Sequence, residues 1–181
     1  FRRWVAMHEE THRVQFTAVP WLRDHMITTT RDLAVDLAPT PGELAERMAH
    51  LAKHLPGAFK EGSSGLAEVF MTAEQKARVA DVTAVMSLLE GHADVVMDDV
   101  GPEVIPSVAR IREKFTQRRA GLNQVDKIVR RILGLEAKMR QYADGAVFVR
   151  AVVAKVGIDG FNAVWTSPET LPTAAEMADP A

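Results

Sequence analysis

The sequence predicts a mainly α-helical protein of one domain, and two observations carry this prediction. Apolar residues recur at helical spacing along most of the 181 residues, whereas the strict alternation typical of a β-strand is nearly absent. Two capping boxes, Thr40 to Glu43 and Thr72 to Gln75, are typical of the points where helices begin. No internal repeat and no second domain are visible in the pattern.

Helix breakers divide the chain into the expected elements. Pro20 ends the first helix, Gly101-Pro102 the longest one, and Gly157 the last long one. A Gly- and Ser-rich loop is expected over residues 56–66. The helices are expected over residues 1–18, 21–37, 40–55, 73–99, 105–133 with a break, and 135–156, followed by a short helical turn from Ser167 to Glu169.

Composition limits the classes of function. The chain is 47% hydrophobic and 25% charged, so it can bury a core. Its net charge of −2 gives no electrostatic reason to expect a nucleic-acid partner, and no apolar stretch approaches the roughly 20 residues of a membrane span. Cysteine is absent, which fits a cytoplasmic protein and means that histidines and carboxylates must hold any metal ion.

The segment His8-Glu9-Glu10-Thr11-His12 is the motif HExxH on a predicted helix. Residues four apart lie on the same helix face, so both imidazoles can reach one metal ion. Glu9 projects about 100° away from His8, beside the ion, where it can take a proton from an attacking water. We therefore predict a zinc site with His8 and His12 as ligands and Glu9 as the general base. The alternative is a chance motif on an amphipathic helix. Against it, the helix is apolar on two sides and is expected to be buried, so its imidazoles would need partners.

Catalytic zinc usually has three protein ligands, and the best candidate for the third is Glu90. The metzincin pattern is excluded because its positions are taken by Gln15 and Ala18. Glu90 lies within a predicted core-facing stripe, where a carboxylate is costly unless it is paired or bound to a metal. The stripe consists of Val79, Val82, Met86, Leu89, Ala93 and Met97.

Two neighbours of Glu90 are assigned other roles. His92 lies about 200° from Glu90 around the helix, so we expect a structural role rather than metal ligation. Asp94 lies one turn after Glu90 and is predicted to accept a hydrogen bond from the outer ring nitrogen of His8 or His12. A solvated Asp94 is the alternative.

Other polar residues give weaker signals. His50 and His54 also share i,i+4 spacing, but they flank an apolar stripe and are expected on a solvated face. His25 is expected to be structural. Tyr142, close to Arg140, is the candidate catalytic donor to the negative charge that develops on a carbonyl oxygen.

Three segments resemble one known family: residues 4–16 around HExxH, residues 88–98 around Glu90, and residues 160–173. The whole chain is similar to the actinobacterial zincin-like metallopeptidases and hydrolases, some of which are labelled as deazaflavin-coenzyme biosynthesis-associated. The resemblance implies a zincin-like helical domain over residues 1–181 and a zinc cofactor. It also implies the gluzincin arrangement, in which a later Glu is the third ligand and an Asp four residues on supports a ligand His. The gap from His12 to Glu90 is longer than in thermolysin-like enzymes.

The function predicted from these residues is that of a zinc metallopeptidase whose peptide or protein substrate the sequence does not name. The alternative is a non-catalytic interaction or scaffold protein with a closed structural metal site. A hydrolase of small amides is a third possibility. Because the chain begins at the active-site helix without an initiator Met, we also expect it to be the C-terminal part of a longer, N-terminally truncated chain.

Overall fold

The computed structural model describes residues 2–38, 71–104 and 135–180, together with positions 42, 106, 109, 110 and 113. Within these ranges the side chains of residues 100–103 and 135–143 lie outside the description. The described part is helical and contains no β-strand, as the sequence predicts. None of its helices combines the length and the apolar character that a membrane crossing requires.

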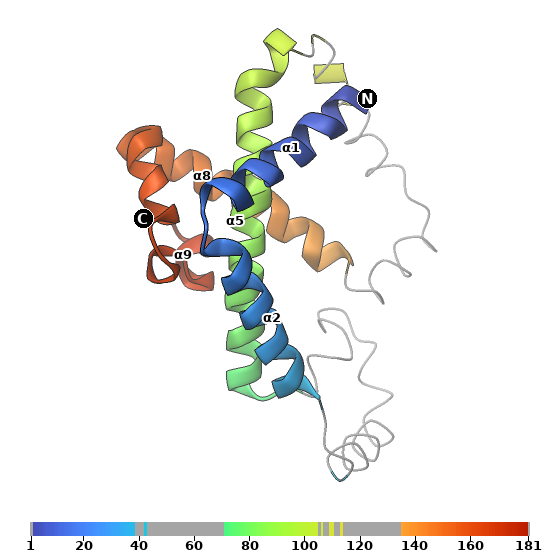
Figure 1. The fold of residues 1–181 in the computed structure, drawn as a ribbon, viewed down its shortest axis with the longest axis vertical. Helices are drawn as coiled ribbons and strands as arrows, with labels where there is room; N and C mark the ends of the chain where they lie inside the picture. The colour runs from blue at the N-terminus through green and yellow to red at the C-terminus, as the bar shows by residue number, and fades with distance from the viewer. Residues whose placement is uncertain are drawn as a thin grey trace.

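The first two helices follow the predicted ranges closely. Helix α1 spans Arg2–Ala18 and α2 spans Leu22–Leu37, with Pro20 in the turn between them. Both lie against α5, the longest described helix, as Figure 1 shows. The helices predicted over 40–55 and 105–133 and the loop predicted over 56–66 fall almost entirely outside the described residues.

Helix α5 spans Ala73–Val104 and begins where the capping box predicts. The backbone N–H of Gln75 donates to Oγ1 of Thr72 at 3.1 Å, and the backbone N–H of Thr72 donates to the side chain of Gln75 at 3.0 Å. The predicted end before Gly101 is wrong, because the helix continues to Val104. Pro102 has no backbone N–H to donate to the carbonyl of Asp98, and the helix ends two residues after it.

Helix α8 spans Leu135–Phe161 and contains one non-helical residue, Gly157, with φ of 73° and ψ of 174°. Because positive φ is costly for side chains with a Cβ atom, glycine permits the predicted break at this position. The chain then forms two short 3₁₀ helices, η1 over Asn162–Trp165 and η2 over Pro168–Thr170, and η2 confirms the predicted turn.

The sequence analysis did not predict the last helix, α9, over Ala174–Ala178. Its signal is a capping box: the backbone N–H of Glu176 donates to Oγ1 of Thr173 at 3.3 Å, and that of Thr173 donates to the Glu176 carboxylate at 2.8 Å. Helix α9 packs on both α5 and α8 and so fixes the C-terminal segment beside them.

Helix α5 is buried on two sides. One side packs with α8 and the C-terminal segment around Leu88, Val149 and Phe161, and the other packs with α1 and α2 around Leu22 and Leu89. The single core-facing stripe predicted for this helix is therefore too narrow. It also includes Met86, whose exposed fraction is 36%. The expected burial of α1 on two sides is also wrong: α1 packs chiefly on α5, and Val14 is 48% exposed.

The backbones of α5 and α8 meet closely where Gly91 faces Gly145. A Cβ atom built on Gly91 would lie 2.1 Å from the carbonyl carbon of Gly145, and one built on Gly145 would lie 1.9 Å from the carbonyl oxygen of Ser87. No side chain can fit at either position without moving a helix backbone. The residue next to this contact on α5 is Glu90, so the helix crossing sets the position of that carboxylate.

Replacing Gly91 with Ala is expected to force the two helices apart and to lower the free energy of unfolding by about 1–3 kcal/mol, as overpacking typically does. Urea unfolding measures this change. Gly42→Ala is the control, because a Cβ atom there would meet nothing within 4 Å. Equal stability of the Gly91 variant and the wild type would show that the helices do not depend on this contact.

Candidate metal centre

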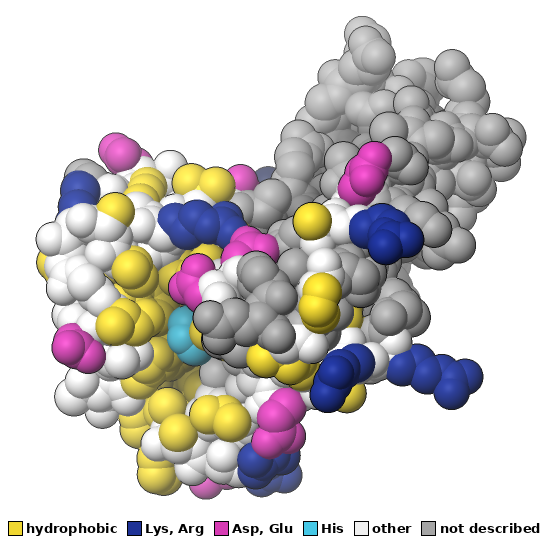
Figure 2. Space-filling view, turned by 90° about the horizontal axis from the view of Figure 1, so that it is seen from above, with side chains coloured by type: hydrophobic (Ala, Val, Ile, Leu, Met, Phe, Trp, Pro, Cys, Tyr) yellow, Lys and Arg dark blue, Asp and Glu magenta, His cyan; other side chains and the backbone are white. Residues whose placement is uncertain are grey.

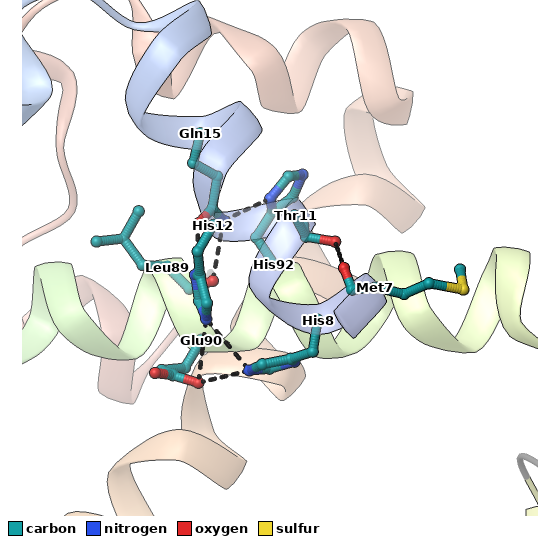
Figure 3. Close-up of polar contacts among 8 residues, drawn as sticks. All are labelled: Met7, His8, Thr11, His12, Gln15, Leu89, Glu90 and His92. Atoms are coloured by element: carbon teal, nitrogen blue, oxygen red, sulfur yellow. Dashed lines mark hydrogen bonds and ion pairs between the residues drawn. The ribbon is translucent and has the colours of Figure 1, made fainter. Parts of the chain in front are cut away.

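Three side chains from two helices converge at the surface between α1 and α5 (Figure 3). The Nε2 atoms of His8 and His12 lie 3.2 Å apart. Oε2 of Glu90 lies 3.4 Å from Nε2 of His8 and 3.7 Å from Nε2 of His12. Among the described residues these three form the one group of potential ligands close enough for a single metal ion.

The three distances fit the edges of a zinc coordination shell. With zinc bonds of about 2.0–2.2 Å to nitrogen and oxygen, two ligands of a tetrahedral site lie about 3.3–3.5 Å apart. By contrast, the contacts of Glu90 with the two rings are longer than good hydrogen bonds between nitrogen and oxygen, which measure about 2.7–3.2 Å. The chemistry of the set, two imidazoles and one carboxylate, also suits zinc.

The electrostatic environment keeps the carboxylate ionised. Polar contact with the ring of His12 and then with that of His8 lowers the pKa of Glu90 from 4.5 to about 2, although burial opposes this shift. The same contact with Glu90 is the main cause that raises the pKa of His12. The site therefore places an ionised carboxylate beside two imidazole rings.

The ligands remain partly open to solvent, as a substrate site requires. The exposed fractions of the His8, His12 and Glu90 side chains are 16%, 20% and 30%. On the face shown in Figure 2, hydrophobic side chains line a hollow, and acidic side chains lie near it.

Local helical geometry explains the placement of the two histidines. They are one turn apart on α1, and their rings meet edge to face with centroids 4.7 Å apart. Trp4, one further turn toward the N-terminus, stacks on the ring of His8 at 5.5 Å. The Trp4–His8–His12 face that the sequence predicts is thus present, and aromatic packing restrains the ring of His8.

The sequence analysis missed the contact that restrains His12. Nδ1 of His12 lies 2.9 Å from Oε1 of Gln15, a residue that is 4% exposed and the one buried residue of α1. The signal was available, because Gln15 follows His12 by three positions and so shares its face. From the sequence alone, Gln15 was notable only as a mismatch with the metzincin pattern.

His92 is not part of the three-residue group. Nδ1 of His92 accepts a hydrogen bond from Nε2 of Gln15 at 2.9 Å, and its ring stacks on Phe161 with centroids 5.5 Å apart. Burial is the main cause that lowers the pKa of His92, followed by the charge of His12. A neutral His92 that accepts from Gln15 agrees with the structural role predicted for it.

The remaining predicted site residues differ in how far the structure places them. Glu9 is exposed on α1, and its charge contributes, after Glu90 and Gln15, to the raised pKa of His12. Asp94 is half-buried on α5, but the outer nitrogen of His12 contacts Gln15 instead, and Nδ1 of His8 has no hydrogen-bond partner among the described residues. The support of His8 by Asp94 therefore stays a prediction.

Several candidates lie away from the site or outside the description. The side chains of Arg140 and Tyr142 fall outside the described residues, as do His50 and His54. The predicted catalytic part of Tyr142 is therefore untested. The ring of His25 contacts Trp21 edge to face, with centroids 5.8 Å apart.

Comparison with known proteins agrees with this geometry. Residues 1–181 match the zincin-like metallopeptidase family. The chain belongs to this family. The match covers the whole chain and lends no support to the expectation that it is a C-terminal part, while the expected actinobacterial origin and deazaflavin association stay predictions. No curated protein matches the chain.

One similar solved structure is described as "a putative hydrolase with a novel fold" from Chloroflexus aurantiacus. It is 33% identical in sequence, with a TM-score of 0.61. The match covers 99% of this chain and 49% of that one, so this zincin-like chain spans about half of the solved protein. The likeness shows that the two proteins share an arrangement of helices over the matched part.

Changing Glu90 to Ala is expected to weaken zinc binding by more than about 10–100-fold. That range is typical when only a hydrogen-bond partner of a ligand is lost, and Glu90 is predicted to be a ligand itself. Competition with a chelator at neutral pH measures the affinity, and X-ray anomalous scattering at the zinc edge identifies the metal. His25→Ala is the control, because His25 is outside the group. Unchanged affinity after loss of Glu90 would remove this residue from the ligand set.

The metal-free protein should be stabilised by the Glu90–His12 pair most strongly between about pH 4.5 and 6.5. The pKa of Glu90 is lowered, so its contribution is present above 4.5 and is lost as the pH falls toward about 2. The pKa of His12 is raised, so its contribution is present below 6.5 and is lost as the pH rises through the folded value. The difference in melting temperature between the metal-free wild type and Glu90→Gln measures the pair, and a difference that is constant from pH 3 to 8 would contradict it.

Proposed function

We propose that this chain is a zinc-dependent metallopeptidase in which His8, His12 and Glu90 hold the metal ion. The observation that carries the proposal is the convergence of exactly three suitable ligand atoms from the described residues. Catalytic zinc sites keep a fourth position for water or substrate, whereas structural sites close it with a fourth protein ligand. His92 is not in this group of ligand atoms, and its ring stacks on Phe161.

The proposed reaction is hydrolysis of an amide bond. A zinc ion at the three ligands supplies Lewis acidity toward the carbonyl oxygen and acidifies the attacking water. The Glu9 carboxylate takes a proton from that water while the oxygen of the water bonds to the carbonyl carbon. The carbon–nitrogen bond then breaks, and Glu9 returns the proton to the leaving amine.

The position of Glu9 supports this assignment. It follows His8 directly on α1, it is exposed, and its charge acts on His12. An exposed carboxylate beside the ligands can reach both a substrate and the water that attacks it, which a buried one cannot.

Tyr142 remains our candidate donor to the developing oxyanion. Its backbone lies in α8, one turn before Gly145, and Gly145 abuts Gly91 next to Glu90. From this proximity we expect that turn of α8 to lie near the metal centre. A cytoplasmic location, for which the absence of cysteine is the argument, belongs to the same proposal.

Changing Glu9 to Gln should leave zinc affinity unchanged and reduce hydrolysis of a cleaved peptide by about 10²–10⁴-fold, the usual contribution of a general base. Glu10→Gln is a matched control: Glu10 is the next residue, is equally exposed, and pairs with Arg13 instead of facing the ligands. It should retain both binding and turnover.

Peptide cleavage at the wild-type rate by the Glu9 variant would refute the role of Glu9. If the wild type binds zinc but cleaves no member of a peptide library, peptidase activity is refuted. Small amide substrates then decide between a different hydrolase and a non-catalytic protein with a structural metal site.

A further inference from the structure

Gln15 occupies an unusual position for a polar residue, since it is buried between α1 and α5 and touches three groups at once. Its side chain lies between His12 on one side and His92 and the backbone of Leu89 on the other (Figure 3). A buried amide must satisfy its donors and acceptor, because each unsatisfied group costs about 1–3 kcal/mol. At Gln15 both amide hydrogens and the oxygen have partners.

The orientation of the amide follows from its contact with Leu89. The carbonyl oxygen of Leu89 can only accept, so the atom that faces it at 3.0 Å must be Nε2 of Gln15. The second hydrogen of Nε2 points to Nδ1 of His92 at 2.9 Å. Oε1 of Gln15 is thereby directed to His12.

This orientation determines where His12 carries its proton. Oε1 of Gln15 can only accept, so Nδ1 of His12 must be the donor across their 2.9 Å contact. In a neutral imidazole one nitrogen carries the hydrogen and the other carries a lone pair. Nε2 of His12, which faces His8 and Glu90, therefore carries the lone pair that a metal ligand requires.

We propose that Gln15 is the positioning residue of the metal centre: its amide, oriented by the Leu89 carbonyl and by His92, holds His12 in the tautomer and ring orientation that bind metal. The contact also joins α1 to α5, the two helices that supply the ligands. The inference rests on the proposed zinc site, but the tautomer of His12 is a property of the metal-free protein as well.

His8 provides an internal contrast. Its Nδ1 is buried and has no hydrogen-bond partner among the described residues, so packing on Trp4 restrains the ring without placing a proton on that nitrogen. The polar contacts of His8 are instead at Nε2, which lies 3.2 Å from Nε2 of His12 and 3.4 Å from Oε2 of Glu90. Gln15 therefore acts directly on His12 and reaches His8 only through it.

Two substitutions separate positioning from a merely structural role. Gln15→Met keeps the approximate size of the side chain but removes the acceptor and both donors. Gln15→Glu keeps an oxygen that accepts from His12 but replaces the donors to Leu89 and His92 by acceptors. The Met variant should bind zinc about 10–100-fold more weakly in chelator competition, as is typical when the outer partner of a ligand His is lost. The Glu variant should bind zinc within a few-fold of the wild type although its melting temperature falls.

Nitrogen-15 NMR of the metal-free full chain gives the readout that does not depend on zinc. At a pH above the raised pKa of His12, the wild-type resonances of His12 should show a protonated Nδ1 and a bare Nε2. In Gln15→Met at the same pH they should show a mixture of tautomers. These results together with the two affinities would support the proposal.

The failures are distinguishable. If Gln15→Met keeps the wild-type tautomer of His12, or if zinc affinity falls in parallel with melting temperature in both variants, Gln15 is only structural and the proposal is overturned. If the wild type shows the expected tautomer but binds no zinc, the metal centre of the proposed function fails while the assignment of Gln15 to His12 stands.

Discussion

The close crossing of α5 and α8 is the constraint on which the site depends. At Gly91 and Gly145 the two helix backbones touch, and a Cβ atom on either residue would overlap the opposing backbone. The crossing brings Phe161, at the end of α8, onto the ring of His92, and it positions α5 so that its other side receives α1. Glu90 adjoins Gly91, so a change in the separation of the helices would move one of the three ligands.

The two histidines are restrained by different forces, although they lie one helical turn apart on α1. His8 is held by stacking on Trp4, which restrains the ring but does not distinguish its nitrogens. His12 is held by a hydrogen bond from Nδ1 to Gln15, which defines both the plane and the tautomer. A hydrogen bond involves one particular ring nitrogen, whereas stacking involves the whole ring, so the constraint at His12 is the more specific of the two.

Much of the fold could be predicted because its signals are local. The ends of α1 and α2, the capping box at Thr72 and the break at Gly157 each depend on a few neighbouring residues. The errors arose where burial depends on distant elements. Met86 belongs to an apolar stripe but is exposed, because α5 packs against partners on two other sides, and the approach of those partners cannot be read from the periodicity of one helix.

The sequence by itself determined which residues share a face of α1, because helical geometry places His8 and His12 one turn apart whatever surrounds them. It also marked Glu90 as an ionisable group in an apolar segment. The match to the zincin-like metallopeptidase family agrees with the HExxH motif of α1. Only the tertiary structure decided that Glu90 lies against both rings, and that Gln15 contacts the outer nitrogen of His12. The contacts between the two helices join residues more than 70 positions apart, and the contact within α1 selects one of several nearby polar groups. The angle and depth at which α1 meets α5 determine both kinds of contact.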